Sequence, residues 1–179
     1  SVHNCCSVLR RLSACLPSVM PITRSTVFAS YHTVVSKSCC TTEILSCQLP
    51  ILIMNAAVEK VIQTALGEVG VVESPKGSNR TKYGLWYGVN GQPWCAIWTS
   101  WVFHHAGYPL PKIQPPCPSG AAYCPYIEHY AKKVGEWHSK PQPGDLALFH
   151  FGKRLAVHIG IVESVHKSGA SFYSIEGNT

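Results

Sequence analysis

The alternation of apolar and polar residues predicts its first clear helix just after Met54. Asn55 is a suitable N-cap, and apolar residues then recur at steps of three and four as far as Gly70. The residues with this spacing are Val58, Val61, Ile62, Ala65, Leu66 and Val69. We expect this amphipathic helix to pack one face against the core of the protein.

Two more helices are predicted further along the chain. A continuous apolar run over residues 96–103 follows Cys95 and stops before a glycine, which indicates a buried helix with Cys95 at its N-terminus. A third helix is expected from about Ala121 to Val134, with Ser119 as its cap and Gly135 ending it.

The segment between the first two helices, residues 71–94, is predicted to be a loop because glycine and proline recur throughout it. Aromatic residues are interleaved with them, and Trp86, Tyr87 and Trp94 are candidates for lining a groove that binds peptide or sugar. For Trp86 and the nearby Tyr83, covering the core of a loop-rich region is an equally good interpretation.

Three strands are predicted in the last third of the chain, over residues 145–149, 158–165 and 172–176. The last two are separated by the turn-like residues 166–170 and should form an antiparallel hairpin. Because the helices come first and the antiparallel strands follow, the expected fold class is α+β, with N-terminal helices packed on a small antiparallel sheet.

The candidate chemistry lies at Cys95 and His158. At a helix N-terminus, unpaired backbone N–H groups and the helix dipole favour the thiolate, which is the nucleophilic form of cysteine. His158 is the first residue of a predicted strand, and a cysteine on a helix tip facing a histidine on a strand is the arrangement of thiol hydrolases. Taken singly, each residue has a plainer structural interpretation, since buried cysteines usually serve packing. Their joint occurrence favours catalysis.

The predicted hairpin supplies candidates for orienting the His158 ring. If its turn centres on Lys167, Glu176 lies opposite His158, and Asn178 lies one pleat further on the same face. Either the acid or the amide could hold the imidazole, although a slip of one residue would turn Glu176 to the other face. The candidate donors to a reaction oxyanion are the backbone N–H of Cys95 and the side chain of Gln92.

No metal or cofactor is expected. Cys117 and Cys124 flank the start of the third helix with six residues between them, and His129 follows. Zinc would need tighter spacing and a fourth ligand. A local disulfide between the two cysteines would require an oxidising compartment.

Several short motifs follow one another between about residues 55 and 179. They are Glu73-Ser74-Pro75, Gly77-Ser78-Asn79, Trp86-Tyr87-Gly88, Pro93-Trp94-Cys95-Ala96, Pro141-Gln142-Pro143-Gly144-Asp145-Leu146, His158-Ile159-Gly160-Ile161-Val162-Glu163 and Ile175-Glu176-Gly177-Asn178-Thr179. In this order they resemble the CHAP domains, which are cysteine- and histidine-dependent amidohydrolases or peptidases. The similarity extends to the catalytic domains of phage lysins that act on actinobacteria.

The resemblance implies a papain-like fold of the NlpC/P60 type, with Cys95 as nucleophile, His158 as general base and Glu176 or Asn178 as the orienting group. It further implies hydrolysis of an amide bond in bacterial peptidoglycan, by an N-acetylmuramoyl-L-alanine amidase or an endopeptidase. Two features depart from the family pattern. Many relatives place an acid where Val157 stands, and residues 83–94, where some relatives hold calcium, contain no acid. We therefore expect no calcium there.

Two other functions are compatible with these residues. A thiol amidase of the same fold could act on a small soluble amide such as a polyamine conjugate, and it would not solubilise cell walls. A non-catalytic wall-binding module would bind walls without cutting them. The second is the weaker alternative, because a binding module gains nothing from placing Cys95, His158 and Glu176 together.

Composition and charge fit one modest enzyme domain. The 179 residues are 46% hydrophobic and 13% charged, which is enough for a substantial core. The net charge of +6 comes from scattered lysines and arginines, which argues against nucleic-acid binding and suits approach to an anionic cell wall. We expect a monomer without a membrane span that acts at the bacterial cell wall, as a phage lysin made in the host cytoplasm or as a secreted bacterial enzyme.

Residues 1–53 differ from the rest of the chain. They hold six of the nine cysteines and show no sustained helical or strand period, and their apolar stretches are too short for a convincing signal peptide. We interpret them as disordered or extraneous, with translation starting at Met54. The catalytic domain would then span residues 54–179 and be cut short at its C-terminal end, which would leave the edge of the last strand without a partner.

Overall fold

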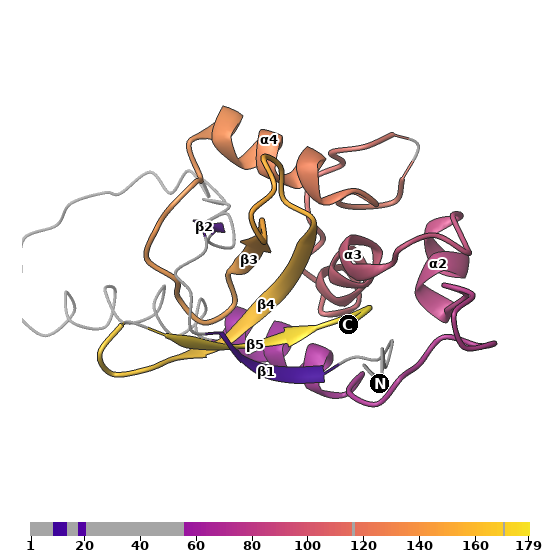
Figure 1. Ribbon diagram of the computed structural model, residues 1–179, viewed down its shortest axis with the longest axis horizontal. Coiled ribbons are helices and arrows are strands. Elements are labelled where there is room, and N and C mark those ends of the chain that lie inside the picture. The colour runs from indigo at the N-terminus through magenta and orange to yellow at the C-terminus, as the bar shows by residue number, and fades with distance from the viewer. Residues whose placement is uncertain (1–8, 14–17, 21–55, 116, 170) are drawn as a thin grey trace, which may run out of the picture.

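The computed structural model describes residues 9–13, 18–20, 56–115, 117–169 and 171–179, and its architecture is α+β (Figure 1). The helices precede the main strands along the chain, as the sequence predicts. They are a helix over residues 56–66, α2 (Lys82–Tyr87), α3 (Cys95–His105) and α4 (Cys124–Val134). The strands are β1 (Leu9–Ser13), β2 (Ser18–Met20), β3 (Leu146–Phe149), β4 (His158–Val165) and β5 (Phe172–Glu176).

The strands form one antiparallel sheet in the order β1-β5-β4-β3-β2. β1 pairs with β5 from Leu9↔Glu176 to Ser13↔Phe172, so the prediction of an unpaired edge beside the last strand is wrong. β1 and β2 lie in the segment for which no regular structure was predicted, because strands this short give no detectable period. The rest of residues 1–53, Met54 and the predicted N-cap Asn55 lie outside the described residues.

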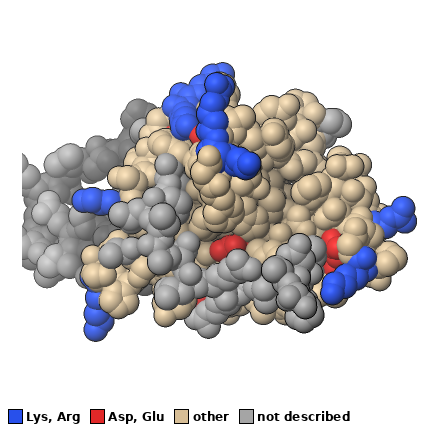
Figure 2. All heavy atoms as spheres, in the orientation of Figure 1, with Lys and Arg blue, Asp and Glu red and all other residues tan. Residues whose placement is uncertain are grey.

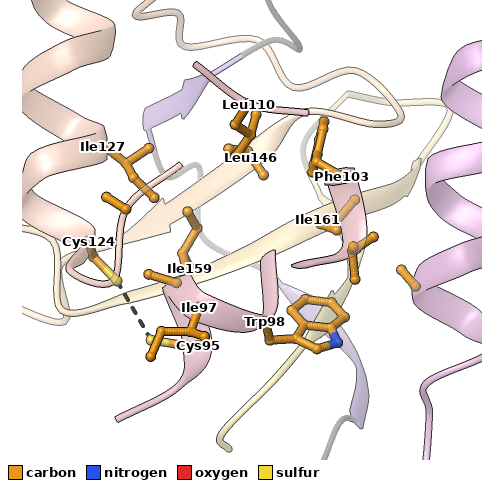
Figure 3. Packing of buried hydrophobic residues seen from close by; sticks show 14 of the residues in the cluster. Cys95, Ile97, Trp98, Phe103, Leu110, Cys124, Ile127, Leu146, Ile159 and Ile161 are labelled. Atoms are coloured by element: carbon orange, nitrogen blue, oxygen red, sulfur yellow. Dashed lines mark hydrogen bonds between the residues drawn. The ribbon is translucent and has the colours of Figure 1, made fainter. Parts of the chain in front are cut away.

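The core fills the space between the helices and one face of the sheet (Figure 3). α3 is almost completely buried and packs against β4, which explains why its sequence is apolar on all sides. The helix over residues 56–66 adds Val61, Ile62 and Ala65 to this cluster. A smaller cluster of Ala147, Phe149, Val162 and Phe172 is separate from it. None of the helices in the described ranges combines the length and apolar character needed to cross a bilayer.

The loop predicted over residues 71–94 contains a short helix, α2 (Lys82–Tyr87), so that prediction is wrong in its second half. Thr81 caps the helix, because its hydroxyl accepts a hydrogen bond from the Gly84 backbone N–H at 3.1 Å. Gly88, at φ 83°, ends it in the left-handed conformation. The helix was not predicted because glycines are frequent in this segment, although its N-cap Thr81 and its final glycine, Gly88, are both present in the sequence.

α4 begins later than predicted. It starts at Cys124 with a proline in its first turn, a favoured position for proline, and it ends at Gly135 as the sequence indicates. Ser119 does not cap it, since its hydroxyl donates a hydrogen bond to the Leu110 carbonyl at 3.1 Å.

The β4–β5 hairpin forms as predicted, but its register differs. Glu176 pairs with Gly160, two residues after His158, because the turn is displaced and the hairpin contains a β-bulge. The turn lies further along the chain than Lys167, so Val165 faces Phe172, and a β-bulge then shifts the register between Val162 and Ser164. The two displacements together equal an even number of residues. Glu176 therefore keeps the same face as His158.

Candidate active site

The residue before Cys95 is anchored to a buried carboxylate. Trp94 is fully buried, and its indole N–H donates a hydrogen bond to Glu73 at 3.4 Å. Glu73 also accepts the backbone N–H groups of Gly77 and, at 2.9 Å, Asn79. One carboxylate thus ties the loop around residues 73–79 to the start of α3 and fixes the position of the Cys95 backbone.

His158 and Glu176 are joined by a direct hydrogen bond. His158 Nε2 lies 2.9 Å from Glu176 Oε2, and the Ser174 hydroxyl donates to the other carboxylate oxygen at 2.6 Å. Glycine at position 160 is required for this arrangement, because a Cβ atom there would lie 2.7 Å from Glu176 Cγ. Both side chains are largely buried, with exposed fractions of 12% for His158 and 5% for Glu176.

Asn178 was the alternative partner for the imidazole. It follows the end of β5 with a backbone φ of 63° and is half-buried. Among the described residues, the carboxylate that accepts a hydrogen bond from the His158 ring is that of Glu176, and no such bond joins the ring to Asn178. The structure therefore brings the acid, and not the amide, to the histidine.

Cys95 and His158 lie within hydrogen-bonding reach of one another. Because Nε2 is engaged by Glu176, the nitrogen left to face the Cys95 sulfur is Nδ1. Burial opposes the charge on the ring, but hydrogen bonds to Cys95 and Glu176 outweigh it and raise the pKa of His158 to about 9. The arrangement can hold an imidazolium beside a thiolate.

A second thiol faces the Cys95 sulfur. Cys124 Sγ lies 3.7 Å from Cys95 Sγ, and the dashed line in Figure 3 joins them. The hydrogen bond with Cys124 and the interaction with His158 hold the pKa of Cys95 well below its usual range, although burial works against them. No local pattern in the sequence predicts that Cys124 lies beside Cys95. Cys117 and Cys124 are free thiols.

An open cleft of about 720 Å³ leads to Cys95. Its walls come from the residues before α3, the start of α4 and the β3–β4 connection. The lining residues are Val89, Gln92, Pro93, Cys95, Ala122, Tyr123, Cys124, Lys153, Arg154, Leu155, Ala156 and Val157. Gln92 was predicted to contact substrate, and the structure places it in this wall.

The three aromatic residues predicted to bind substrate lie elsewhere. Trp94 and Tyr87 are buried in the core, and Trp86 packs at 5.2 Å from the ring of His104 and 5.7 Å from that of His105. None of the three lines the cleft described above. Their physical role in this region is packing, the alternative left open for Trp86.

The cleft carries positive charge that sequence reasoning did not single out. Lys153 and Arg154 belong to its wall, and no acidic residue of the described chain does. Figure 2 shows lysine and arginine side chains gathered at the end of the molecule where α4 and the β3–β4 connection lie. Two adjacent basic residues shortly after a predicted strand were the available signal, but the basic residues are scattered along the sequence and gather only in the folded chain. Among the described residues, no group of three or more His, Cys, Asp or Glu is placed to hold a metal ion.

Comparison with known proteins gives one match. A family model described as CHAP domain matches residues 86–178, which include Cys95, His158 and Glu176. No curated protein and no solved structure matches this chain. The matched region covers more than half of the chain and contains the helix-tip cysteine, the strand histidine and its carboxylate partner. The chain therefore belongs to the CHAP domain family, the cysteine- and histidine-dependent amidohydrolases or peptidases.

Proposed function

We propose that the protein is a peptidoglycan hydrolase of papain-like, NlpC/P60-type fold that cleaves an amide bond of the bacterial cell wall by thiol catalysis. The observation that carries the proposal is the chain of contacts from Cys95, which lines an open cleft, through His158 to Glu176. A nucleophile, a base and a group that orients the base are the parts that covalent acyl transfer needs.

The reaction begins with the thiolate of Cys95. It attacks the carbonyl carbon of the amide, and the C–N bond breaks as the His158 imidazolium gives its proton to the departing amine. The neutral imidazole then takes a proton from water, and the resulting hydroxide attacks the thioester carbonyl. The acid is released and the Cys95 thiolate and His158 imidazolium are restored. Glu176 holds the ring so that Nδ1 faces the sulfur throughout.

The oxyanion formed during attack needs hydrogen-bond donors. The backbone N–H of Cys95 has no acceptor within α3, because Cys95 is the first residue of that helix. Gln92 lines the same cleft and is the side-chain candidate for a second donor. Asn178 has no part in this mechanism.

The cleft suits an extended, negatively charged polymer. Its walls combine apolar side chains, among them Tyr123 and Leu155 with exposed fractions of 55% and 45%, with the cations Lys153 and Arg154. Cell-wall peptides carry free carboxylates, and a basic cleft to which the described residues contribute no acid attracts them. The enzyme would act at the wall as a phage lysin or as a secreted bacterial protein.

The test is hydrolysis of purified cell walls by the full chain and by Cys95→Ala. We expect the parent protein to release soluble fragments and Cys95→Ala to lose at least about 10⁴-fold of that rate, because it has no nucleophile. The matched control is Cys117→Ala, which removes another buried free thiol outside the cleft. Mass spectrometry of the fragments identifies the bond. New N-terminal alanine indicates an amidase, and other new amines indicate an endopeptidase.

Three outcomes would contradict the proposal. Turnover of small soluble amides without release of wall fragments would favour a thiol amidase on a small substrate. Binding to walls without solubilisation, unaffected by thiol-blocking reagents, would favour a wall-binding module. Retention of the parent's rate in Cys95→Ala would remove Cys95 from the role of nucleophile.

A further inference from the structure

We propose that Cys124 is a positioning residue of the active site, whose thiol donates a hydrogen bond to the Cys95 sulfur and holds it in the charged, nucleophilic form. The inference rests on the proposed function of Cys95. The two sulfur atoms are 3.7 Å apart, within the range of an S–H···S hydrogen bond (Figure 3).

The fold brings the two thiols together through two helix ends. Cys95 is the first residue of α3 and Cys124 is the first residue of α4, so two helix N-termini converge on one pair of sulfur atoms. Each N-terminus presents partial positive charge, which favours an anion between them. Cys95 is 6% exposed and Cys124 is 4% exposed, so water competes little for this hydrogen bond.

The direction of the hydrogen bond follows from the surroundings of the two thiols. The contact with Cys95 and burial both raise the pKa of Cys124, which therefore keeps its proton. The contact with Cys124, and after it the one with His158, lowers the pKa of Cys95. Since Cys95 is the thiol that also contacts His158, we infer that Cys124 is the donor and Cys95 the acceptor. The other charged or titratable groups that the described residues place around the pair are His158, Glu176 behind it, and Tyr123, Lys153 and Arg154 in the cleft wall.

Packing alone could also bring two sulfur atoms to this distance, so the test must follow the ionisation of Cys95 itself. Fully reduced protein is treated with iodoacetamide between about pH 4 and pH 10, and the rate at which the Cys95 peptide is alkylated is measured by mass spectrometry, because only the thiolate reacts. The variants are Cys124→Ala, which removes the donor, and Cys124→Ser, which keeps one. Cys117→Ala controls for the loss of a buried thiol elsewhere.

We expect the pH midpoint of Cys95 alkylation to rise by about one unit in Cys124→Ala, since a hydrogen bond to a charged group is lost. Cys124→Ser should recover most of this shift, and Cys117→Ala should match the parent. Thermal unfolding of each variant shows that the folded protein is being compared. A purely structural role for Cys124 would lower the unfolding temperature and leave the midpoint where it is.

Two results would overturn the inference. One is a midpoint in Cys124→Ala equal to that of the parent. The other is a Cys124→Ser midpoint as high as that of Cys124→Ala, because the shift would then not follow the hydrogen-bond donor. The alkylation assay uses no substrate, so its outcome is independent of the cell-wall assay. Failure of the proposed function appears instead as wall hydrolysis that survives Cys95→Ala.

Discussion

Among the described residues, two histidine–glutamate pairs have a buried carboxylate, and the comparison between them distinguishes a candidate catalytic pair from a structural one. His158 lies 2.9 Å from Glu176, and His150 lies 3.3 Å from Glu128. Both glutamate side chains are almost fully buried. The residue types and the distances are similar, so neither identifies a catalytic pair.

The pairs differ in what else each contacts. The His158 ring also contacts Cys95, so in the proposed mechanism the carboxylate of this pair orients a base beside a nucleophile. Glu128 instead bonds the Lys132 side chain and accepts the backbone N–H of Ala156 at 2.8 Å. It ties the β3–β4 connection, which forms one wall of the cleft, to α4. The two pairs are therefore distinguished by the further group that each contacts, which is Cys95 for the pair of His158 and the Ala156 backbone for the pair of Glu128.

The largest expected difference is between the two histidines. His158→Gln should lower kcat by about 10⁴-fold, since it removes the general acid and base of the reaction. His150→Gln should leave kcat within about twofold of the parent, because its ring contacts Glu128 and not Cys95. Steady-state rates on purified walls measure both. Comparable losses in the two variants would show that the comparison of the pairs is mistaken.

The two glutamates should differ less. Glu176→Gln should lower kcat by about 10²-fold, because an amide holds the ring less firmly and stabilises the imidazolium less well. Gly160→Ala should produce part of this loss of kcat, although it changes no polar group. The added Cβ atom at position 160 would displace the Glu176 side chain. Asn178→Ala is the matched control and should retain the parent rate. A larger loss in Asn178→Ala than in Glu176→Gln would assign the orienting role to the amide.

Sequence reasoning placed His158 and Glu176 side by side, as they are in the structure, but by a register that is wrong. The prediction placed the two residues on one face by assuming a symmetric turn. In the structure the turn is displaced and a bulge lies between Val162 and Ser164. The two shifts add up to an even number of residues, so both side chains still lie on the same face of the sheet. A bulge leaves no mark in an apolar pattern of period two. The sequence could therefore predict that Glu176 lies on the same face of the sheet as His158, but not which residue it pairs with.

The helices show where local pattern is sufficient. α3 and the helix over residues 56–66 were predicted within a few residues, because one is continuously apolar and the other is amphipathic. α2 was missed among glycines despite the cap at Thr81. The contact between Cys95 and Cys124 could not be predicted, since it depends on how two helix ends meet and not on either local sequence.

The pH profile should also separate the two pairs. Activity should rise with pH as Cys95 ionises, at a pH well below that of an ordinary thiol, and should fall above about pH 9 as His158 loses its proton. Glu176 favours the charged ring, so Glu176→Gln should move the falling limb to lower pH. Glu128→Gln should leave that limb in place. A falling limb that does not move in Glu176→Gln would contradict the assignment.

The raised pKa of His158 has a consequence for folding as well. A group whose pKa is higher in the folded state stabilises that state fully below its unfolded pKa, here about 6.5, and the stabilisation is lost as pH rises through about 9. Chemical denaturation of the parent protein and of His158→Gln between these pH values measures this effect. The lowered pKa of Cys95 acts in the opposite direction, because it stabilises the folded state increasingly as pH rises. The two contributions therefore offset each other in the parent, and His158→Gln, which keeps only that of Cys95, should gain stability relative to the parent as pH rises.

The smallest effect on chemistry is expected at Glu128. Glu128→Ala leaves the Ala156 N–H without its acceptor and should lower the free energy of unfolding by about 1–3 kcal/mol. Because Ala156 and its neighbours line the cleft, loosening this wall should raise KM for wall fragments a fewfold while kcat changes little. Lys132→Ala is the milder control, since its side chain is 51% exposed and the pair it forms is partly solvated. A fall in kcat with KM unchanged would mean that Glu128 acts on the reacting groups, and the division between a catalytic and a structural pair would then fail.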